Sequence, residues 1–256
     1  MVPVVALADG RHADLHSADL ATVADYVNIA NTSGVTPLHN VCRAFDPDED
    51  DIDIMRRNQA EIAVLLLAAG ASPDAKMNSG TTPLHHTVES DRLDIMAILI
   101  SANADLDARD VDGFTALHFA VLEEASLIRS GEGHRAETSI RMLLAAGADV
   151  NAPTLPPAQA HATHISDITD TPMELAIRAC CVRLWPVFLR GGATLPQAVF
   201  RFASPYLNRM RELGGIAAYE KAHRKSFVAL LAPKFPRLPV EVLAHIASFW
   251  AHVGDY

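Results

Sequence analysis

Aromatic residues, cysteines and long apolar runs are all scarce in this 256-residue chain, and each shortage excludes a class of protein. Aromatic residues make up only 6 % although half of the chain is hydrophobic, so Ala, Leu, Val and Ile dominate, as they do in packed helices. The three cysteines, Cys42, Cys180 and Cys181, form no CxxC motif, which favours reduced thiols in a cytoplasmic or nuclear protein. No apolar run is long enough for a membrane span, and the N-terminus makes a poor secretory signal.

Basic residues are also scarce, and they are unevenly distributed. Residues 1–193 contain 13 Lys and Arg against 27 Asp and Glu, whereas residues 194–256 contain 8 against 4. This asymmetry predicts a chain of two parts. Because duplex binding needs a concentrated basic face, nucleic acid is not an expected partner.

Motifs of catalysis and cofactor binding are missing too. The sequence has no GxSxG, Walker loop, HExxH or GxGxxG pattern, so it predicts no catalytic residue, no cofactor and no enzyme activity. His161 and His164 lie close together, but a metal site needs a further ligand with matching geometry. No metal site is therefore predicted.

An acidic segment, DPDEDDID, begins at Asp46. Its alternating Asp46, Asp48 and Asp50 are spaced as in an EF-hand loop, but Asp51 and Arg57 replace the glycine and the glutamate that such a loop requires. A solvated acidic loop that leads into a helix is the plainer interpretation. A docking site for a basic partner is the alternative.

Four related tetrapeptides recur along the chain, and each has the features of a helix start. Thr is a good N-cap, Pro fits the first helical position, and the apolar third residue can point into a core. The tetrapeptides begin at Thr36, Thr82, Thr115 and Thr171 and read TPLH, TPLH, TALH and TPME.

A second marker follows each tetrapeptide after an apolar run: Gly70-Ala71, Asn103-Ala104, Gly147-Ala148 and Gly192-Ala193. Gly or Asn after a helix is typical of a left-handed C-cap. Each unit is therefore predicted to be a helix, a turn, a second helix and a polar hairpin. The marker spacing indicates three insertions in this frame, at about 45–58, 122–137 and 153–169.

This pattern resembles the ankyrin repeat over about residues 31–193. The resemblance implies an all-α solenoid of stacked helix–turn–helix units with β-hairpin fingers, whose histidines bond locally and link neighbouring units. It also implies a scaffold that binds one or more protein partners through the finger tips and the first helices. The positions that correspond are Asn40, Arg43, Lys76, Met77, Asn78, His86, Glu89, Arg109, Asp110, Asp112, Phe119 and Glu123.

One modification is also implied by the resemblance. Asn151, in LLAAGADVNA, occupies the hairpin position at which an asparagine is hydroxylated in some ankyrin proteins.

The two ends of the predicted stack differ from the repeats. Residues 1–30 form an N-terminal segment. A helix is expected over 17–31, because Leu20, Val23, Ala24, Val27 and Ala30 fall on one face, and it is interpreted as an N-terminal cap or a degenerate first repeat. Residues 194–256 form a helical region, with helices expected near 196–213 and 216–231 on either side of a Gly-Gly pair.

The last segment, 236–256, contains an apolar stripe at helical spacing. Its pattern Leu-Pro-x-Glu-Val-Leu-x-x-Ile-x-Ser-Phe resembles the opening of an F-box, truncated and C-terminal as in PRANC proteins, and implies a Skp-type cullin adaptor as partner. The matching and stripe residues are Leu238, Pro239, Glu241, Val242, Leu243, Ile246, Ser248, Phe249 and Trp250. The end of a SOCS box and a plain capping helix remain open as alternatives.

Two functions therefore compete. The chain is expected to be a protein-binding scaffold, as a monomer or as a subunit of a hetero-complex. The alternative is the substrate receptor of a cullin ubiquitin ligase that uses the C-terminal helix as its adaptor hook. Exposure of that helix would favour the second function.

Overall fold

The computed structural model describes residues 26–43, 52–131, 136–154, 170–195, 205–233, 239 and 241–243. Most of the expected N-terminal helix and of the acidic segment, and the pair His161 and His164, lie outside these ranges. The chain divides into two compact units, residues 1–172 and 173–256. This division lies inside helix α8, before the predicted boundary at 194.

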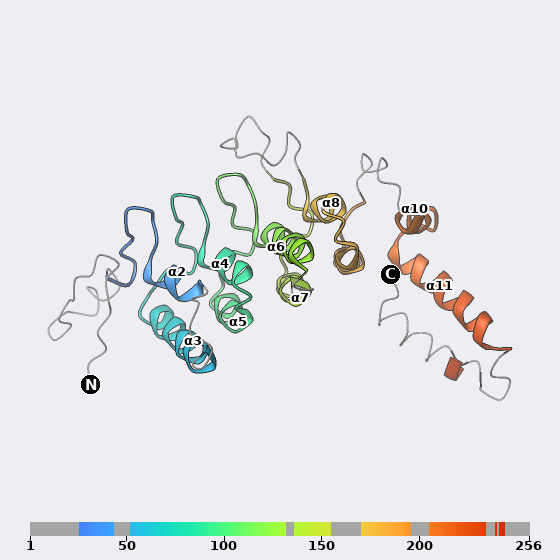
Figure 1. The fold of residues 1–256 in the computed structure, drawn as a ribbon, viewed down its shortest axis with the longest axis horizontal. Helices are drawn as coiled ribbons and strands as arrows, with labels where there is room; N and C mark the ends of the chain where they lie inside the picture. Colours follow the sequence, from blue (N-terminus) through green and yellow to red (C-terminus); the bar gives the residue numbers. More distant parts are fainter. Residues whose placement is uncertain are drawn as a thin grey trace. The chain divides into compact units, whose positions relative to one another are not determined.

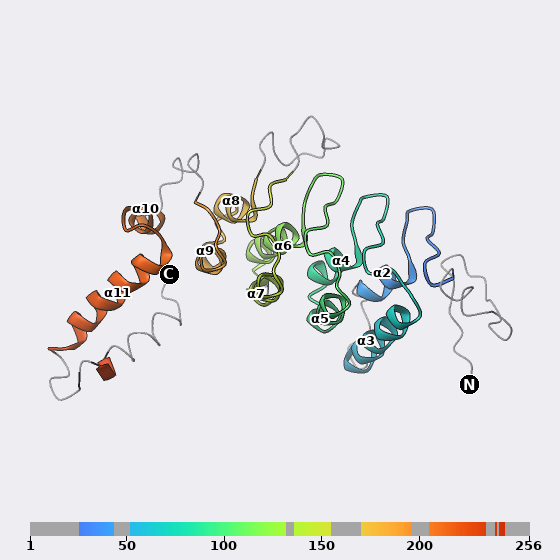
Figure 2. The ribbon, with the colours of Figure 1, turned by 180° about the vertical axis from the view of Figure 1, so that it is seen from behind.

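The first unit consists of helix pairs arranged in two layers. The first helices, α2, α4 and α6, form one layer, the second helices α3, α5 and α7 form the other, and finger-like loops project from one edge (Figures 1 and 2). The helices are α2 (Pro37–Cys42), α3 (Ile52–Ala68), α4 (Pro83–Glu89), α5 (Leu93–Ser101), α6 (Ala116–Ser130) and α7 (Ala136–Ala146).

The predicted helix starts and stops are confirmed. Thr36, Thr82 and Thr115 are the N-caps of α2, α4 and α6. The C-terminal markers adopt the left-handed backbone conformation expected of them, with φ of 92° at Gly70, 58° at Asn103, 101° at Gly147 and 92° at Gly192. The motif leucines Leu38, Leu84 and Leu117 are at most 1 % exposed, so the tetrapeptides anchor the first helices in the core.

The fingers are built of turns rather than of the expected β-hairpins: the described ranges contain no strand. Their tips stack instead through single backbone bonds, in which the Asn78 N–H donates to Ser33 O and the Val111 N–H to Ser79 O, each at 2.9 Å. A Cβ at Gly80 would lie 2.8 Å from the Cα of Asp110. The glycine thus allows one finger to rest directly on the backbone of the next.

Two of the three insertions, whose conformation the spacing had left open, lie partly within helices. The first, at about 45–58, overlaps the start of α3, which has 17 residues against 9 in α5, its counterpart in the second repeat. The second extends α6 to 15 residues against 7 in α4. Its sequence from Leu122 to Ser130, LEEASLIRS, contains several strong helix formers and ends at a left-handed cap, Gly131.

The second unit contains most of α8 (Pro172–Arg178), then the 3-10 turn η2 (Val182–Leu184), α9 (Trp185–Arg190), α10 (Pro205–Glu212) and α11 (Ile216–Leu231). Aromatic rings link its helices. The ring centroids of Trp185 and Tyr206 lie 6.5 Å apart in a stacked arrangement, and those of Tyr206 and Tyr219 lie 5.0 Å apart in an edge-on arrangement. Arg190 of α9 forms an ion pair with Glu220 of α11 at 2.7 Å. The helix predicted at 216–231 is therefore present, and α10 lies within the one predicted near 196–213.

Among the described residues, no helix is both long enough and apolar enough to cross a membrane.

Candidate functional site

The motif histidines close the N-terminus of each first helix. Nδ1 of His85 accepts a hydrogen bond from the Thr82 backbone N–H at 3.1 Å, and the Thr82 side chain bonds the backbone at His85 in return. The same reciprocal capping box joins His39 to Thr36 and His118 to Thr115. Each imidazole thereby replaces the glutamate or glutamine that usually completes such a box.

The other ring nitrogen of each histidine approaches a backbone carbonyl of the following repeat. Because Nδ1 accepts a bond, the proton of the neutral ring resides on Nε2, which can donate to a carbonyl. The acceptors are Thr81 O for His39 at 3.4 Å, Phe114 O for His85 at 3.2 Å and Asp170 O for His118 at 3.1 Å. The role that the resemblance implies for these histidines, a local bond plus a link to the neighbouring repeat, is thus confirmed.

Burial keeps these three rings neutral. The residues are at most 1 % exposed, and desolvation lowers the pKa of His39, His85 and His118 to about 4, against the raising effect of the bonds to the backbone carbonyls. A neutral ring is what the linkage needs, since Nδ1 cannot accept a hydrogen bond once it is protonated.

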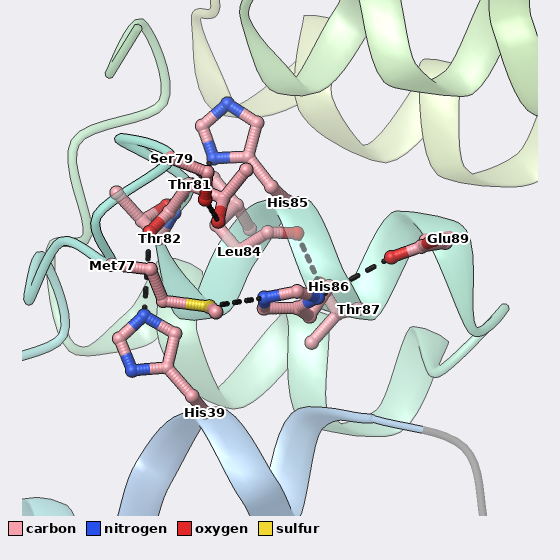
Figure 3. Close-up of polar contacts among 10 residues, drawn as sticks. All are labelled: His39, Met77, Ser79, Thr81, Thr82, Leu84, His85, His86, Thr87 and Glu89. Carbon is pink, nitrogen blue, oxygen red and sulfur yellow. Dashed lines mark hydrogen bonds and ion pairs between the residues drawn. The ribbon is translucent and has the colours of Figure 1, made fainter. Parts of the chain in front are cut away.

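His86, next to the linking His85, lies in a separate polar cluster (Figure 3). Its Nε2 is 3.1 Å from Met77 Sδ on the finger, and its Nδ1 is 3.3 Å from Glu89 Oε2 on α4. The hydrogen bond from His86 is the main cause that lowers the pKa of Glu89, and nearby Arg43 contributes to it. The cluster thus combines groups from the finger and α4 with the charge of Arg43, the residue that follows α2.

His86, one of the positions expected to bind a partner, is only 8 % exposed. Its Met77 and Glu89 contacts and an edge-on approach to the His39 ring at 5.8 Å explain the burial. The sequence of the short helix α4 could not predict the burial of His86, because the groups that cover it come from the finger and from α2.

The remaining first-helix positions are accessible. Asn40, Arg43 and Glu89 are exposed, while Phe119 and Glu123 on α6 are half-buried. Phe119 packs edge-on against the His85 ring at 4.9 Å. The structure therefore places these residues on the first-helix layer of one unit, with Phe119 serving partly as packing.

The finger-tip positions are largely engaged with neighbouring fingers. Lys76 Nζ donates to Arg109 O at 3.0 Å and Asn78 Nδ2 to Thr32 O at 2.9 Å, while the Arg109 guanidinium donates to Pro153 O. Asp110 Oδ1 accepts two backbone N–H groups of its own turn, including that of Asp112 at 3.0 Å. These side chains stabilise the row of fingers besides any role in binding.

One set of linking residues was missed by the sequence interpretation. Oδ1 of Asp74 accepts the Asp105 N–H at 2.7 Å, and Oδ1 of Asp107 accepts the Asp149 N–H at 2.8 Å. Both acids follow the Gly or Asn marker by four residues. That recurrence was visible in the sequence and could have identified them.

Asn151 stands at the same distance after Gly147. It is half-buried in a turn in which its backbone N–H donates to Asp149 Oδ1 at 2.9 Å. Its position therefore corresponds to that of the linking acids Asp74 and Asp107, and its hydroxylation stays a prediction.

The C-terminal motif is only partly described. Pro239, Glu241 and Val242 are exposed, and Leu243 is 1 % exposed. The other motif positions, Leu238, Ile246, Ser248, Phe249 and Trp250, lie outside the described residues. The one buried leucine shows that the motif packs at least in part against its own chain.

In the parts of the chain that the structure describes, no group of three or more His, Cys, Asp or Glu side chains is arranged to hold a metal ion. The site is thus a surface of polar and apolar side chains on a stacked helical frame.

Comparison with known proteins agrees with this frame. No match was found among curated proteins. Residues 52–154, from α3 to the loop after α7, match the family model described as ankyrin repeats in three copies. This stretch carries ankyrin repeats, which are protein–protein interaction modules, and the fold is an all-α ankyrin-repeat solenoid.

Proposed function

We propose that the chain is a non-catalytic scaffold that binds a protein partner on the first-helix layer and fingers of its first unit. The observation that supports this proposal is the combination of a rigid frame with an accessible face. The frame is held by the buried imidazole links of His39, His85 and His118, and it does not depend on the exposed residues Asn40, Arg43 and Glu89. Surface side chains on such a frame can vary without loss of the fold.

The centre of the proposed interface is the cluster of Arg43, Met77, His86 and Glu89. Glu89 and Met77 are pre-positioned, because His86 Nδ1 lies 3.3 Å from Glu89 Oε2 and His86 Nε2 lies 3.1 Å from Met77 Sδ. A partner that binds there loses little side-chain entropy on contact. Arginine, here Arg43, is one of the residue types enriched in binding hot spots.

The test is affinity capture with the tagged full chain and two charge-swapped variants. Arg43→Glu with Glu89→Arg inverts the charges of the proposed interface. Glu137→Arg with Arg141→Glu swaps an exposed pair on α7, 2.6 Å apart, as the matched control. We expect the first variant to lose most of the captured partner and the control to retain it. Equal capture by both variants would refute this interface.

A second candidate function rests on the C-terminal motif, and we propose it as the alternative. In it, residues 236–256 bind a Skp-type adaptor and the repeats present a substrate to a cullin ubiquitin ligase. The support is the motif itself together with the exposure of Glu241 and of Val242, whose exposed fraction is 42 %. Leu243, which is buried, weighs toward a capping helix.

This alternative is tested with a purified Skp-type adaptor and the full chain. Leu238→Ala with Ile246→Ala should abolish adaptor binding while the repeats stay folded, as judged by circular dichroism. Val182→Ala, an exposed apolar residue outside the motif, is the control and should bind normally. If the unaltered chain does not bind the adaptor, the ligase function is excluded and the scaffold function is unaffected.

A further inference from the structure

His86 is enclosed by groups of three elements, and both of its ring nitrogens have a partner. Nδ1 lies 3.3 Å from Glu89 Oε2 on α4, and Nε2 lies 3.1 Å from Met77 Sδ on the finger (Figure 3). The His39 ring of α2 lies edge-on to it, with 5.8 Å between the ring centroids. Because His86 is buried, water has little access to replace either partner.

Both partners of His86 are hydrogen-bond acceptors. A thioether sulfur has no hydrogen to donate, and an ionised carboxylate only accepts. Glu89 is ionised near neutral pH, because the hydrogen bond from His86 lowers its pKa. A neutral imidazole has one N–H and one bare nitrogen, so it can donate to Glu89 or to Met77 but not to both. Only the imidazolium, with a proton on each nitrogen, satisfies both contacts.

The adjacent His85 shows the opposite arrangement. Its Nδ1 accepts the Thr82 N–H, and its Nε2 faces Phe114 O. A neutral ring, with one donor and one acceptor, therefore matches both partners of His85, and burial keeps that ring neutral by lowering its pKa to about 4. The two neighbouring histidines thus suit different charge states.

Charged groups of all three elements affect the protonation of His86. On α4, the Glu89 carboxylate attracts a proton to Nδ1. His39 of α2 is kept neutral by burial, which lowers its pKa to about 4, so it does not repel an imidazolium above that pH. Two cations oppose protonation, Arg43 after α2 and Lys76 on the finger, but both are exposed, and solvent weakens their effect.

We propose that His86 is a pH-dependent tether that joins the finger around Met77 to α4. As an imidazolium it donates to Glu89 and to Met77 together, and this holds the finger against the first-helix layer. On deprotonation the remaining N–H stays with the Glu89 carboxylate, because a charged acceptor forms the stronger hydrogen bond, and the finger loses this bond to α4. Histidine side chains change charge between about pH 5 and 8, so the tether responds within that range.

Partner binding depends on this tether only if the finger contributes to the interface, as the proposed function holds. In that case the partner binds more tightly at about pH 6 than at about pH 8. The tether itself is a property of the free chain and is tested without a partner. Failure to capture a partner therefore does not affect its test.

Nuclear magnetic resonance of the histidine ring nitrogens in the isotope-labelled full chain tests the protonation. Between about pH 5.5 and 8, we expect the His86 ring to change from two protonated nitrogens to one, with the remaining proton on Nδ1. His39, His85 and His118 should keep a single proton on Nε2, because burial lowers their pKa to about 4. A His86 ring whose protonation does not change over this range, or whose remaining proton resides on Nε2, would overturn the proposal.

Amide hydrogen exchange in the same chain measures the effect on the finger. The hydrogen-bonded amides of Met77, Asn78 and Gly80 report on it, after correction for the intrinsic pH dependence of exchange. They should exchange about fivefold faster at about pH 8 than at about pH 6, as expected for the loss of one hydrogen bond. His86→Gln cannot gain a charge, so its corrected rates should be equal at the two pH values. His223→Gln, at an exposed position on α11, is the matched control and should keep the difference.

Met77→Leu removes the sulfur acceptor and keeps an apolar side chain, so its finger amides should exchange fast at both pH values. This variant keeps the proposal testable if His86→Gln does not fold, and amides of α5 report folding in every variant. Slow exchange of the Met77→Leu finger at about pH 6 would overturn the proposal. So would corrected rates that do not depend on pH in the unaltered chain, or an equal pH dependence in His86→Gln.

Discussion

At the scale of single residues, the neutral imidazole of the motif histidine is the group that connects neighbouring repeats. Each of His39, His85 and His118 accepts one backbone N–H within its own helix cap and donates to a carbonyl further along the chain. The resemblance to the ankyrin repeat implied this role. It could not name the acceptors, because they lie 29 to 52 residues away.

Substitution of His85 by alanine should remove both bonds and leave buried backbone groups without partners. A net loss of about 1 kcal/mol for each hydrogen bond predicts a decrease of about 2 kcal/mol in the free energy of unfolding. Urea denaturation followed by circular dichroism measures it. His223→Ala, at an exposed position on α11, is the control and should change stability little.

The same histidines predict a loss of stability in mild acid. In the unfolded chain they titrate near 6.5, whereas burial lowers their pKa in the folded protein to about 4. The unfolded state therefore binds more protons between these values, and the free energy of unfolding decreases as the pH falls from 6.5 toward 4. Urea midpoints at pH 7.5 and 5.0 should show the decrease.

A His85→Gln variant provides the control for this pH effect. It removes one of the three titrating rings, so its midpoint should change less between pH 7.5 and 5.0 than that of the unaltered chain. An equal change in both proteins would show that other groups cause the acid sensitivity.

At the scale of elements, the fingers depend on glycines that let backbones touch. Gly80 has a φ of +78°, and a Cβ there would lie 2.8 Å from both Asp110 Cα and Val111 N. Gly131, at the end of α6, has the same φ with nothing within 4 Å of an added Cβ. Alanine substitutions at these two glycines therefore distinguish the cost of backbone strain, present at both, from the cost of a steric clash, present only at Gly80.

Gly131→Ala should therefore cost about 1 kcal/mol, the strain of a left-handed alanine, whereas Gly80→Ala should cost about 2–4 kcal/mol because a clash is added. Thermal or urea unfolding of the two variants provides the comparison. Equal losses would mean that the fingers move apart freely and do not stabilise one another.

How far the sequence predicts each element depends on whether the contacts are local. Caps at Thr82 and Gly70 follow from local backbone rules, so their positions were predicted correctly. The extension of α6 was taken as an insertion between helices because repeat spacing gives length and not conformation. The finger roles of Lys76 and Asn78 depend on carbonyls of other fingers, which no local pattern specifies.

At the scale of the whole molecule, the two units carry opposite charge. Residues 1–172 contain 10 Lys and Arg against 26 Asp and Glu, whereas residues 173–256 contain 11 against 5. An acidic repeat region should associate more slowly with its partner as ionic strength rises if that partner is basic. Association rates measured at about 50 and 500 mM salt should then differ, and unchanged rates would indicate a neutral or apolar interface.

The proposed function requires that a protein partner bind the first helices and fingers of the first unit. Hydrogen–deuterium exchange of the chain, free and in complex with its captured partner, measures this binding. We expect slower exchange on binding in α2, α4 and the finger around Met77, with α5 and α7 unchanged. Protection confined to the second helices or to residues 236–256 would contradict it.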